Sequence, residues 1–315
     1  MTIVDNLQAR RRNESDRDYS PRSCCKQRDV VTRFGAHAYV WESVWTPEAA
    51  RRVIERGAAA GLDFVQIPLI RAETFDGPAT KAMLDEYGLA AVFSVSLPVH
   101  AGFPEHPQAA ESLIKRSVDI VSDAGGALLT GVLYGTLGSM TGHPPTEREL
   151  DLVSCTLGRA AQYAAAKGIS LAIEPVNRYE NHLINSTKQG LALIERVGEP
   201  NVFLHLDTYH MNIEEKGFRK PILDAGDKLK YIHLSESDRG TPGTGNVHWD
   251  DFFAALSEIE YQGDMAMESF GAVNPDIARA TCIWRDIAPS PDILVRDGLS
   301  FLRAKARAHG VGMRP

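Results

Sequence analysis

Short apolar runs rich in β-branched and aromatic residues alternate along the chain with longer segments of helical period. This alternation is typical of βα units that build a parallel sheet. We expect eight strands, at Phe34–Val40, Phe64–Leu69, Ala90–Ser96, Ala127–Leu133, Ser170–Glu174, Val202–Asp207, Tyr231–Ser235 and Met265–Ser269. Eight strands with intervening helices favour a closed α/β barrel, the (β/α)8 TIM barrel, although the pattern alone leaves an open sheet as an alternative.

The segments between the strands carry the start and stop signals of helices. We expect helices at Thr46–Ala60, from Thr146 to about Gly168, at Thr187–Val197 and at Pro291–Ala308. A threonine at a helix start can accept a hydrogen bond from a free amide, and a glycine such as Gly198 suits the end of a helix. We also expect Asp250 to cap the helix before the last strand.

The N-terminal segment has a different composition, with many Arg, Asp, Ser and Asn residues and few large apolar ones. Such a segment cannot bury enough apolar surface to offset the entropy of ordering. We therefore expect residues 1–32 to form a disordered tail and residues 33–310 to form one (β/α)8 catalytic domain. The alternative, a basic arm for nucleic acid or an acidic partner, rests on Arg10, Arg11 and Arg12, which acidic residues flank.

The composition favours a small-molecule enzyme over a nucleic-acid-binding protein. The 315 residues are 43% hydrophobic and 24% charged, which is enough apolar material for one large core. The net charge is −7, so the chain has no overall positive field that would attract phosphate backbones. We expect a small-molecule substrate and no nucleic acid partner.

The cysteines and the apolar runs indicate a cytoplasmic location. Cys24, Cys25, Cys155 and Cys282 have neither the paired spacing of a zinc site nor that of a secreted disulfide framework. No run of about 18 apolar residues is present, and the N-terminus lacks the apolar core of a signal peptide. We expect reduced thiols, no membrane contact and a cytoplasmic protein.

Four predicted strands end on polar residues that an apolar core would reject, namely Glu174, Asp207, His233 and Glu268. Neighbours in this set are about one βα repeat apart along the chain. Because the carboxyl ends of barrel strands meet at one rim, we expect the four side chains to converge. The alternative, that each is only a polar strand end, is less favoured when four such ends match.

This composition calls for a divalent cation. Three carboxylates placed together without a cation would repel one another and raise each other's pKa. Carboxylate oxygens with one imidazole suit Mn²⁺, Mg²⁺ or Co²⁺ better than a metal that prefers thiolates. Such an ion can hold two neighbouring sugar oxygens and stabilise an enediolate, while Glu174 and Glu268 act as base and acid on opposite faces of the reacting carbon.

Five segments resemble the ketose 3-epimerases, which have a xylose isomerase-like TIM barrel and include the D-tagatose, D-psicose (allulose) and L-ribulose 3-epimerases. The segments are Glu174-Pro-Val-Asn-Arg-Tyr-Glu180, Leu206-Asp-Thr-Tyr-His-Met-Asn-Ile-Glu-Glu215, His233-Leu-Ser-Glu-Ser-Asp-Arg239 with Gly243-Thr-Gly245, Met267-Glu-Ser-Phe270 and Ile283-Trp-Arg-Asp286. The likeness runs from about Arg33 to the C-terminus, in the same order and at similar spacing. The second segment is the most specific of the five.

The resemblance implies a single Mn²⁺-type site at Glu174, Asp207, His233 and Glu268, with Glu174 and Glu268 exchanging the C3 proton of a ketose. It also implies that Glu180, His210 and Arg239 hold the O1 to O3 end of the sugar. Each of these three has an alternative as a solvated or packed residue, because loop charges commonly serve no site. Family habit further implies a homo-oligomer, either a dimer or a tetramer.

Other residues near the predicted rim are less distinctive. His37, Tyr39 and Trp41 fit the aromatic start of the family, and core packing would explain them equally well. His205 shares the strand parity of Asp207, and we expect it to be a buried neighbour rather than a fifth ligand. Gln66 departs from the family, which often has a glutamate near the end of strand two, so the preferred ketose does not follow from the resemblance.

Several functions compete with ketose 3-epimerisation because fold alone does not determine chemistry. Hydroxypyruvate isomerase, xylose isomerase and inosose dehydratase relatives use the same kind of barrel. An apurinic endonuclease-like hydrolase would need more histidines at the rim and a basic face, whereas this chain has 10 histidines and a negative net charge. A sugar-binding protein without activity is disfavoured because both candidate proton-transfer glutamates are present.

Overall fold

The computed structural model describes residues 32–271, 278 and 281–312, and its strands form a closed barrel in chain order. Every neighbouring pair is parallel, and β8 pairs with β1. The strands are β1 (Phe34–His37), β2 (Phe64–Pro68), β3 (Ala90–Ser94), β4 (Leu128–Gly131), β5 (Ser170–Ile173), β6 (Val202–Asp207), β7 (Leu229–Leu234) and β8 (Asp264–Met267). The predicted (β/α)8 barrel is therefore confirmed, and the pairing of β8 with β1 excludes an open sheet.

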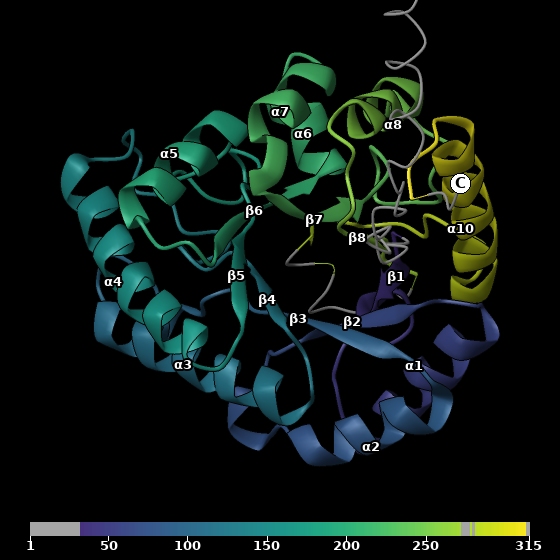
Figure 1. The fold of residues 1–315 in the computed structure, drawn as a ribbon, viewed down its shortest axis with the longest axis horizontal. Coiled ribbons are helices and arrows are strands. Elements are labelled where there is room, and N and C mark those ends of the chain that lie inside the picture. The colour runs from purple at the N-terminus through teal and green to yellow at the C-terminus, as the bar shows by residue number, and fades with distance from the viewer. Residues whose placement is uncertain (1–31, 272–277, 279–280, 313–315) are drawn as a thin grey trace, which may run out of the picture. The chain divides into compact units, whose positions relative to one another are not determined.

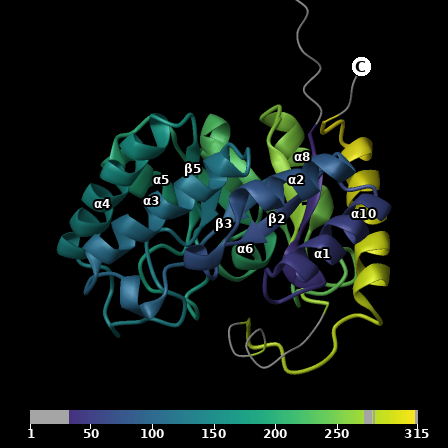
Figure 2. The same cartoon turned by 90° about the horizontal axis from the view of Figure 1, so that it is seen from below.

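Helices surround this ring of strands, as Figures 1 and 2 show. They are α1 (Pro47–Ala59), α2 (Gly77–Tyr87), α3 (Pro107–Asp123), α4 (Glu147–Ala165), α5 (Thr187–Val197), α6 (Thr208–Glu214), α7 (Arg219–Ala225), α8 (Trp249–Glu258) and α10 (Pro291–Ala308). The long helices bury one apolar face against the strands; α1, for example, buries Val53 and Ile54. Among the described residues, no helix is both long enough and apolar enough to cross a bilayer.

The helix starts follow side-chain capping chemistry. Thr46 accepts a hydrogen bond from the backbone N–H of Ala49 at the start of α1. Thr146 accepts from the N–H of Glu149 at the start of α4, and the Glu149 carboxylate accepts from the N–H of Thr146 in return. These reciprocal bonds satisfy amides that a helix start leaves free, so both predicted starts are confirmed.

Two predicted caps are wrong. The cap of α5 is Ser186 rather than Thr187, because the Ser186 hydroxyl accepts from the N–H of Gln189. Helix α8 begins directly after His248, which places Asp250 in its first turn instead of before it. The Asp250 carboxylate accepts hydrogen bonds from Lys305 on α10, so it joins two helices and does not cap either.

Strand β1 is shorter than the sequence predicts. The apolar run continues to Val40, but the strand ends at His37 and residues Ala38–Val40 form a 3-10 turn. The cause is local, since Nδ1 of His37 accepts a hydrogen bond from the backbone N–H of Tyr39 at 3.1 Å. This bond turns the chain where periodicity alone would continue the strand.

The interior of the barrel has two layers that differ in chemistry. The first is an apolar cluster of buried residues from six of the strands: Phe64, Val92, Leu128, Ala172, Tyr231 and Ala266. Strand side chains alternate between the two faces, so the residue two positions later lies on the same face. Those positions hold Gln66, Ser94, Thr130, Glu174, His233 and Glu268. The polar layer therefore follows the apolar cluster along the strands and lies at their carboxyl ends.

The tail predicted for residues 1–32 lies outside the described residues, except for Thr32, which is buried. Cys24 and Cys25 also lie outside them, whereas Cys155 and Cys282 are exposed free thiols. The described barrel extends from β1 through α10. The domain boundaries at residues 33 and 310 stay a prediction.

Gly131 ends β4 in a conformation that other residues rarely adopt. Its φ is +116°, and a Cβ atom built there would lie 2.5 Å from the backbone oxygen of Val95. The Gly131 carbonyl accepts the N–H of Glu174 at 3.1 Å, so this backbone fixes the end of β5 as well. Only glycine fits this close approach of two strand ends.

We expect Gly131→Ala to lower the free energy of unfolding by about 3 kcal/mol, because positive φ and a backbone clash act together. Gly168→Ala is the matched control, since Gly168 has φ +70° but no atom within 4 Å of the added Cβ. The control should lose only about 1 kcal/mol. Urea unfolding followed by circular dichroism measures both, and equal losses would contradict the role given to the Val95 contact.

Candidate metal and catalytic centre

The structure brings the side chains of Glu174, Asp207, His233 and Glu268 together at the carboxyl ends of β5 to β8. One ligand atom from each residue lies within 4.8 Å of the ligand atoms of the other three. All four side chains are buried. The sequence expectation of four converging strand ends therefore matches the observed positions.

Backbone contacts fix the position of Glu174 immediately after β5. Its N–H donates to the carbonyl of Gly131. Its own carbonyl accepts from the hydroxyl of Tyr134 at 2.9 Å, and that hydroxyl also lies 2.8 Å from the carbonyl of Ile184. Tyr134 is fully buried, so it ties the loop after β4 to the loop after β5 and holds Glu174 at the rim.

The two oxygens of the Asp207 carboxylate have separate tasks. Oδ1 accepts from the N–H groups of Tyr209 and His210 and so caps α6. Oδ2 points into the centre, where the Arg239 guanidinium donates to it at 2.8 Å. The helix cap thus orients the second oxygen toward the cluster.

The cluster attracts positive charge. Nδ1 of His233 lies 3.1 Å from Glu174 Oε1, 3.5 Å from Asp207 Oδ2 and 3.4 Å from Glu268 Oε2. Burial by itself would lower the pKa of His233, but the nearby Glu268 and Glu174 raise it well above its usual value. The side chains therefore stabilise a cation at the point that His233 Nδ1 faces, which is the property a divalent metal site needs.

The two glutamates have pKa values displaced in opposite directions. Burial raises the pKa of Glu174, with His233 only partly opposing the effect. Burial acts in the same direction on Glu268, but His233 and Arg239 outweigh it, so the pKa of Glu268 is well below its usual value. Paired carboxyls with opposite displacements can serve as proton donor and proton acceptor.

Arg239 lies within the centre in an unusual backbone conformation. Its φ is +65°, and its guanidinium carbon lies 3.9 Å from the ring centroid of Tyr209. Nη1 donates to Asp207 and to the carboxylate of Glu268. The aromatic face and the two carboxylates hold the planar guanidinium in one orientation.

Glu180 and His210 lie beside Arg239. Nδ1 of His210 accepts from the N–H of Asn177 at 3.0 Å, so the proton of the neutral ring is on Nε2. That nitrogen is 3.2 Å from Nη2 of Arg239 and 4.0 Å from Oε2 of Glu180. The side chain of Asn177 donates to the other oxygen of Glu180. The three predicted substrate residues therefore form one group of donors and acceptors next to the cluster.

The aromatic and histidine residues near the rim differ in their surroundings. His37 is buried, and burial lowers its pKa to about 3, so it is neutral at physiological pH. Tyr39 stacks on Phe270, and the indole N–H of Trp41 donates a hydrogen bond to the carboxylate of Asp292. His205 is fully buried with Nδ1 2.8 Å from the Thr130 hydroxyl and 3.5 Å from Glu174 Oε2, so it can also form a three-residue group with Glu174 and His233.

Sequence reasoning gave no role to Glu236, which holds the loop that carries Arg239. Both oxygens of this fully buried carboxylate accept hydrogen bonds within the loop. The donors are the N–H groups of Ser237, Gly243 and Val247 and the indole N–H of Trp249. The signal in the sequence is an acidic residue followed by Gly243 and Gly245. In the structure, a Cβ atom on Gly245 would lie 2.5 Å from the carboxylate of Glu236.

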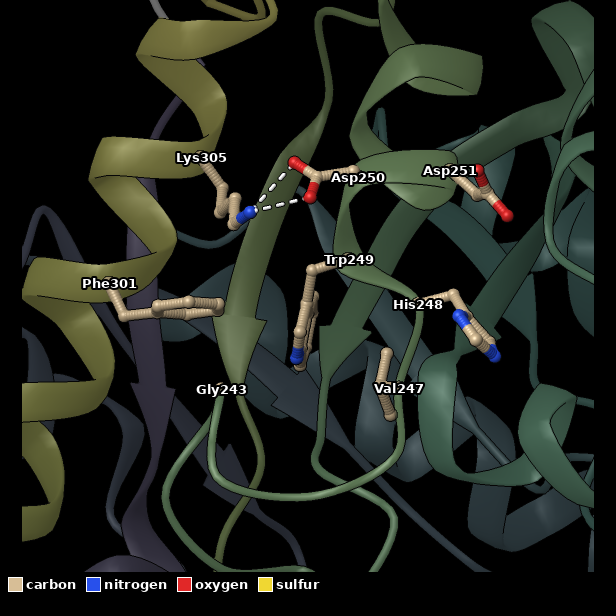
Figure 3. Close-up of a pocket in the computed structure, with 8 residues that line it drawn as sticks. All are labelled: Gly243, Val247, His248, Trp249, Asp250, Asp251, Phe301 and Lys305. Carbon is tan, nitrogen blue, oxygen red and sulfur yellow. Dashed lines mark hydrogen bonds and ion pairs between the residues drawn. The ribbon is translucent and has the colours of Figure 1, made fainter.

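A cavity of about 330 Å³ lies apart from this centre, between the start of α8, the preceding loop and α10 (Figure 3). Figure 3 shows the indole of Trp249 between Phe301 and Val247, with Asp250 turned toward Lys305. None of the predicted site residues lines this cavity. Three residues of its lining, Gly243, Val247 and Trp249, also donate hydrogen bonds to Glu236.

We expect Glu236→Gln to lower the free energy of unfolding by about 2–4 kcal/mol, because the amide nitrogen must face buried N–H donors in either orientation. Amide hydrogen exchange in residues 236–249 should become faster. Glu258→Gln, which changes an exposed ion pair with Arg219, is the control and should cost less than about 0.5 kcal/mol. Unchanged exchange in that loop would show that Glu236 does not order it.

Comparisons with known proteins agree with this geometry. The family model described as "Xylose isomerase-like TIM barrel" matches residues 54–305. The chain is 40% identical over 278 residues to the L-ribulose 3-epimerase of Methylomonas sp. (strain DH-1), covering 86% of this chain and 97% of that protein. It is 38% identical over 282 residues to the ketose 3-epimerase of Arthrobacter globiformis, covering 88% and 97%.

A solved structure extends the likeness to three dimensions. The D-allulose 3-epimerase from Methylomonas sp., crystallised with D-allulose, superposes with a TM-score of 0.84 at 39% identity, covering 87% of this chain and 97% of that chain. The likeness therefore spans the strands that carry the polar cluster as well as the surrounding helices. The chain belongs to the xylose isomerase-like TIM barrel family and, within it, to the ketose 3-epimerases.

Proposed function

We propose that this protein catalyses the reversible epimerisation of free ketoses at C3, with D-tagatose, D-psicose and L-ribulose as candidate substrates. The observation that carries the proposal is the presence of two buried glutamates, Glu174 and Glu268, in one cluster of four strand-end residues. The relatives named as L-ribulose and ketose 3-epimerases support it.

The donor set fits a divalent cation. Three carboxylates and one imidazole are hard or borderline ligands, and the raised pKa of His233 reflects the same demand for positive charge. We propose Mn²⁺ as the cofactor, held by Glu174, Asp207, His233 and Glu268, with Co²⁺ or Mg²⁺ as other candidates. When bound, such a cation supplies positive charge beside two neighbouring oxygens of the sugar.

The two glutamates would move the proton. One carboxylate takes the proton from C3 and becomes neutral, which leaves the electron pair on the sugar as an enediolate. The other glutamate, initially protonated, returns a proton to C3 from the opposite face, so the configuration inverts. The opposed pKa displacements of Glu174 and Glu268 suit such an acid–base pair.

Arg239, His210 and Glu180 would orient the sugar. The guanidinium of Arg239 and the Nε2–H of His210 are donors that lie 3.2 Å apart, so one sugar oxygen can accept from both. The Glu180 carboxylate can accept from a neighbouring hydroxyl. Fixing the O1 to O3 end in this way places C3 between the two glutamates.

Other reactions of this barrel class remain alternatives, chiefly those of a hydroxypyruvate isomerase or an inosose dehydratase, with an apurinic endonuclease-like hydrolase more distant. They differ from the proposed reaction in the carbon that exchanges its proton or in the bond that breaks. A cytoplasmic location, a homo-oligomeric state and the absence of a nucleic acid partner stay predictions.

Incubation of each candidate ketose with enzyme and Mn²⁺ in D₂O should place one deuterium at C3 of both epimers, because the proton passes through glutamates that exchange with solvent. Proton NMR and mass spectrometry measure the position and the number of labels. Chelation with EDTA should stop exchange, and added Mn²⁺ should restore it. Deuterium at C1 would indicate an aldose–ketose isomerase, and release of water would indicate a dehydratase.

Glu174→Gln and Glu268→Gln should each lower kcat for epimerisation by about 10³-fold or more, because a glutamine cannot exchange the proton. Each variant, shown to be loaded with Mn²⁺, should retain C3 exchange of the one epimer whose proton faces the remaining glutamate. Glu258→Gln is the control and should retain the wild-type rate. A wild-type rate in either active-site variant would remove that glutamate from the mechanism.

A further inference from the structure

Gln66 on β2 lies in the polar layer of the barrel without an assigned role. Its side chain is 1% exposed, and it crosses the interior to residues of β7. Oε1 is 2.7 Å from the hydroxyl of Tyr231 and 2.6 Å from Nε2 of His233. The amide nitrogen of Gln66 is buried and has no hydrogen-bond partner among the residues that the structure describes. Within that part of the chain, the side chain therefore makes its hydrogen bonds through the oxygen.

The oxygen at this position constrains the imidazole of His233. An oxygen that accepts from the Tyr231 hydroxyl and lies 2.6 Å from Nε2 requires that Nε2 carry a hydrogen. In the neutral ring the other nitrogen then has a free lone pair. That nitrogen is Nδ1, which faces the carboxylates of Glu174, Asp207 and Glu268 at 3.1 to 3.5 Å.

We propose that Gln66 is a positioning residue that keeps the proton of His233 on Nε2 and presents the lone pair of Nδ1 to the cation. This inference rests on the metal site proposed above. The hydrogen bond partner of a ligating histidine fixes both its tautomer and its ring orientation.

Other contacts of the His233 ring do not supply a substitute acceptor. Tyr231 packs against the ring in a T-shaped arrangement, with centroids 5.6 Å apart, and its hydroxyl is directed to Gln66. His205 packs against it at 4.1 Å with planes at 89°, while its own Nδ1 is directed to Thr130. Among the described residues, Gln66 is the acceptor that Nε2 of His233 contacts.

Metal affinity tests the proposal without using activity. The dissociation constant for Mn²⁺ is measured on the full-length apoprotein by the EPR signal of free Mn²⁺ and by calorimetry. Gln66→Leu should bind Mn²⁺ about 10–100-fold more weakly, because Nε2–H loses its acceptor. Gln66→Glu restores an acceptor for both donors and should bind at least as tightly as the wild type.

Tyr231→Phe is the matched control, since it also removes a buried polar contact of Gln66 but leaves the oxygen opposite His233. Its Mn²⁺ affinity should stay within about threefold of the wild type, a smaller change than the loss of about 10–100-fold expected for Gln66→Leu. Equal affinity of Gln66→Leu and the wild type would overturn the proposal. If the wild type itself binds no Mn²⁺, the metal site proposed above is contradicted. This outcome can be told apart from failure of the Gln66 proposal, because it is seen in the wild type before any variant is compared.

The tautomer provides a second measurement, which holds even if Gln66→Leu does not fold. Long-range ¹H–¹⁵N spectra of the wild type, with labelled histidine and diamagnetic Mg²⁺ or Zn²⁺, should show His233 protonated on Nε2. Gln66→Glu should keep this tautomer. A proton on Nδ1 in the metal-loaded wild type would overturn the proposal, because the lone pair would then face away from the carboxylates.

Discussion

Three buried carboxylates meet at the carboxyl ends of the barrel strands, and positive charge must balance them. The arrangement of this end of the barrel depends on that constraint. Asp207, Glu174 and Glu268 meet in the buried interior of the barrel, and isolated charges there would be very unfavourable. The guanidinium of Arg239 supplies part of the balance and binds two of the three. The remaining demand raises the pKa of His233, and it makes the centre suitable for a divalent cation.

The barrel meets this constraint by separating its interior into layers. Apolar side chains such as Phe64 and Val92 fill the lower level, and the polar residues come two positions later on the same inward face. Close strand ends, such as Gly131 against the backbone of Val95, hold the rim together. The loop after β7 then adds Arg239, and helix α6 adds His210, so the scaffold and the proposed recognition of the sugar reside in different parts of the chain.

The sequence predicted the barrel and the four strand-end residues because both leave periodic signals: an apolar run every βα repeat, and a polar residue that interrupts it. It did not predict the end of β1, which depends on one bond from Tyr39 to His37. It also missed Glu236, since the donors that identify its role are backbone N–H groups of a loop. Gln66 was recognised only as a departure from the family, because its partners on β7 become neighbours only when the barrel closes.

The proposed centre would hold positive and negative charges in nearly equal number. A divalent cation and Arg239 would carry three positive charges, and four carboxylates face them, those of Asp207, Glu174, Glu268 and, beside Arg239, Glu180. When one of Glu174 and Glu268 holds the proton that the proposed reaction needs, the two signs balance, and positive charge beside the sugar favours the negative charge of an enediolate. A proton that moves between sugar and glutamate does not alter that total. A neutral His37 and the amide of Gln66 can therefore orient groups around the centre without changing its charge balance.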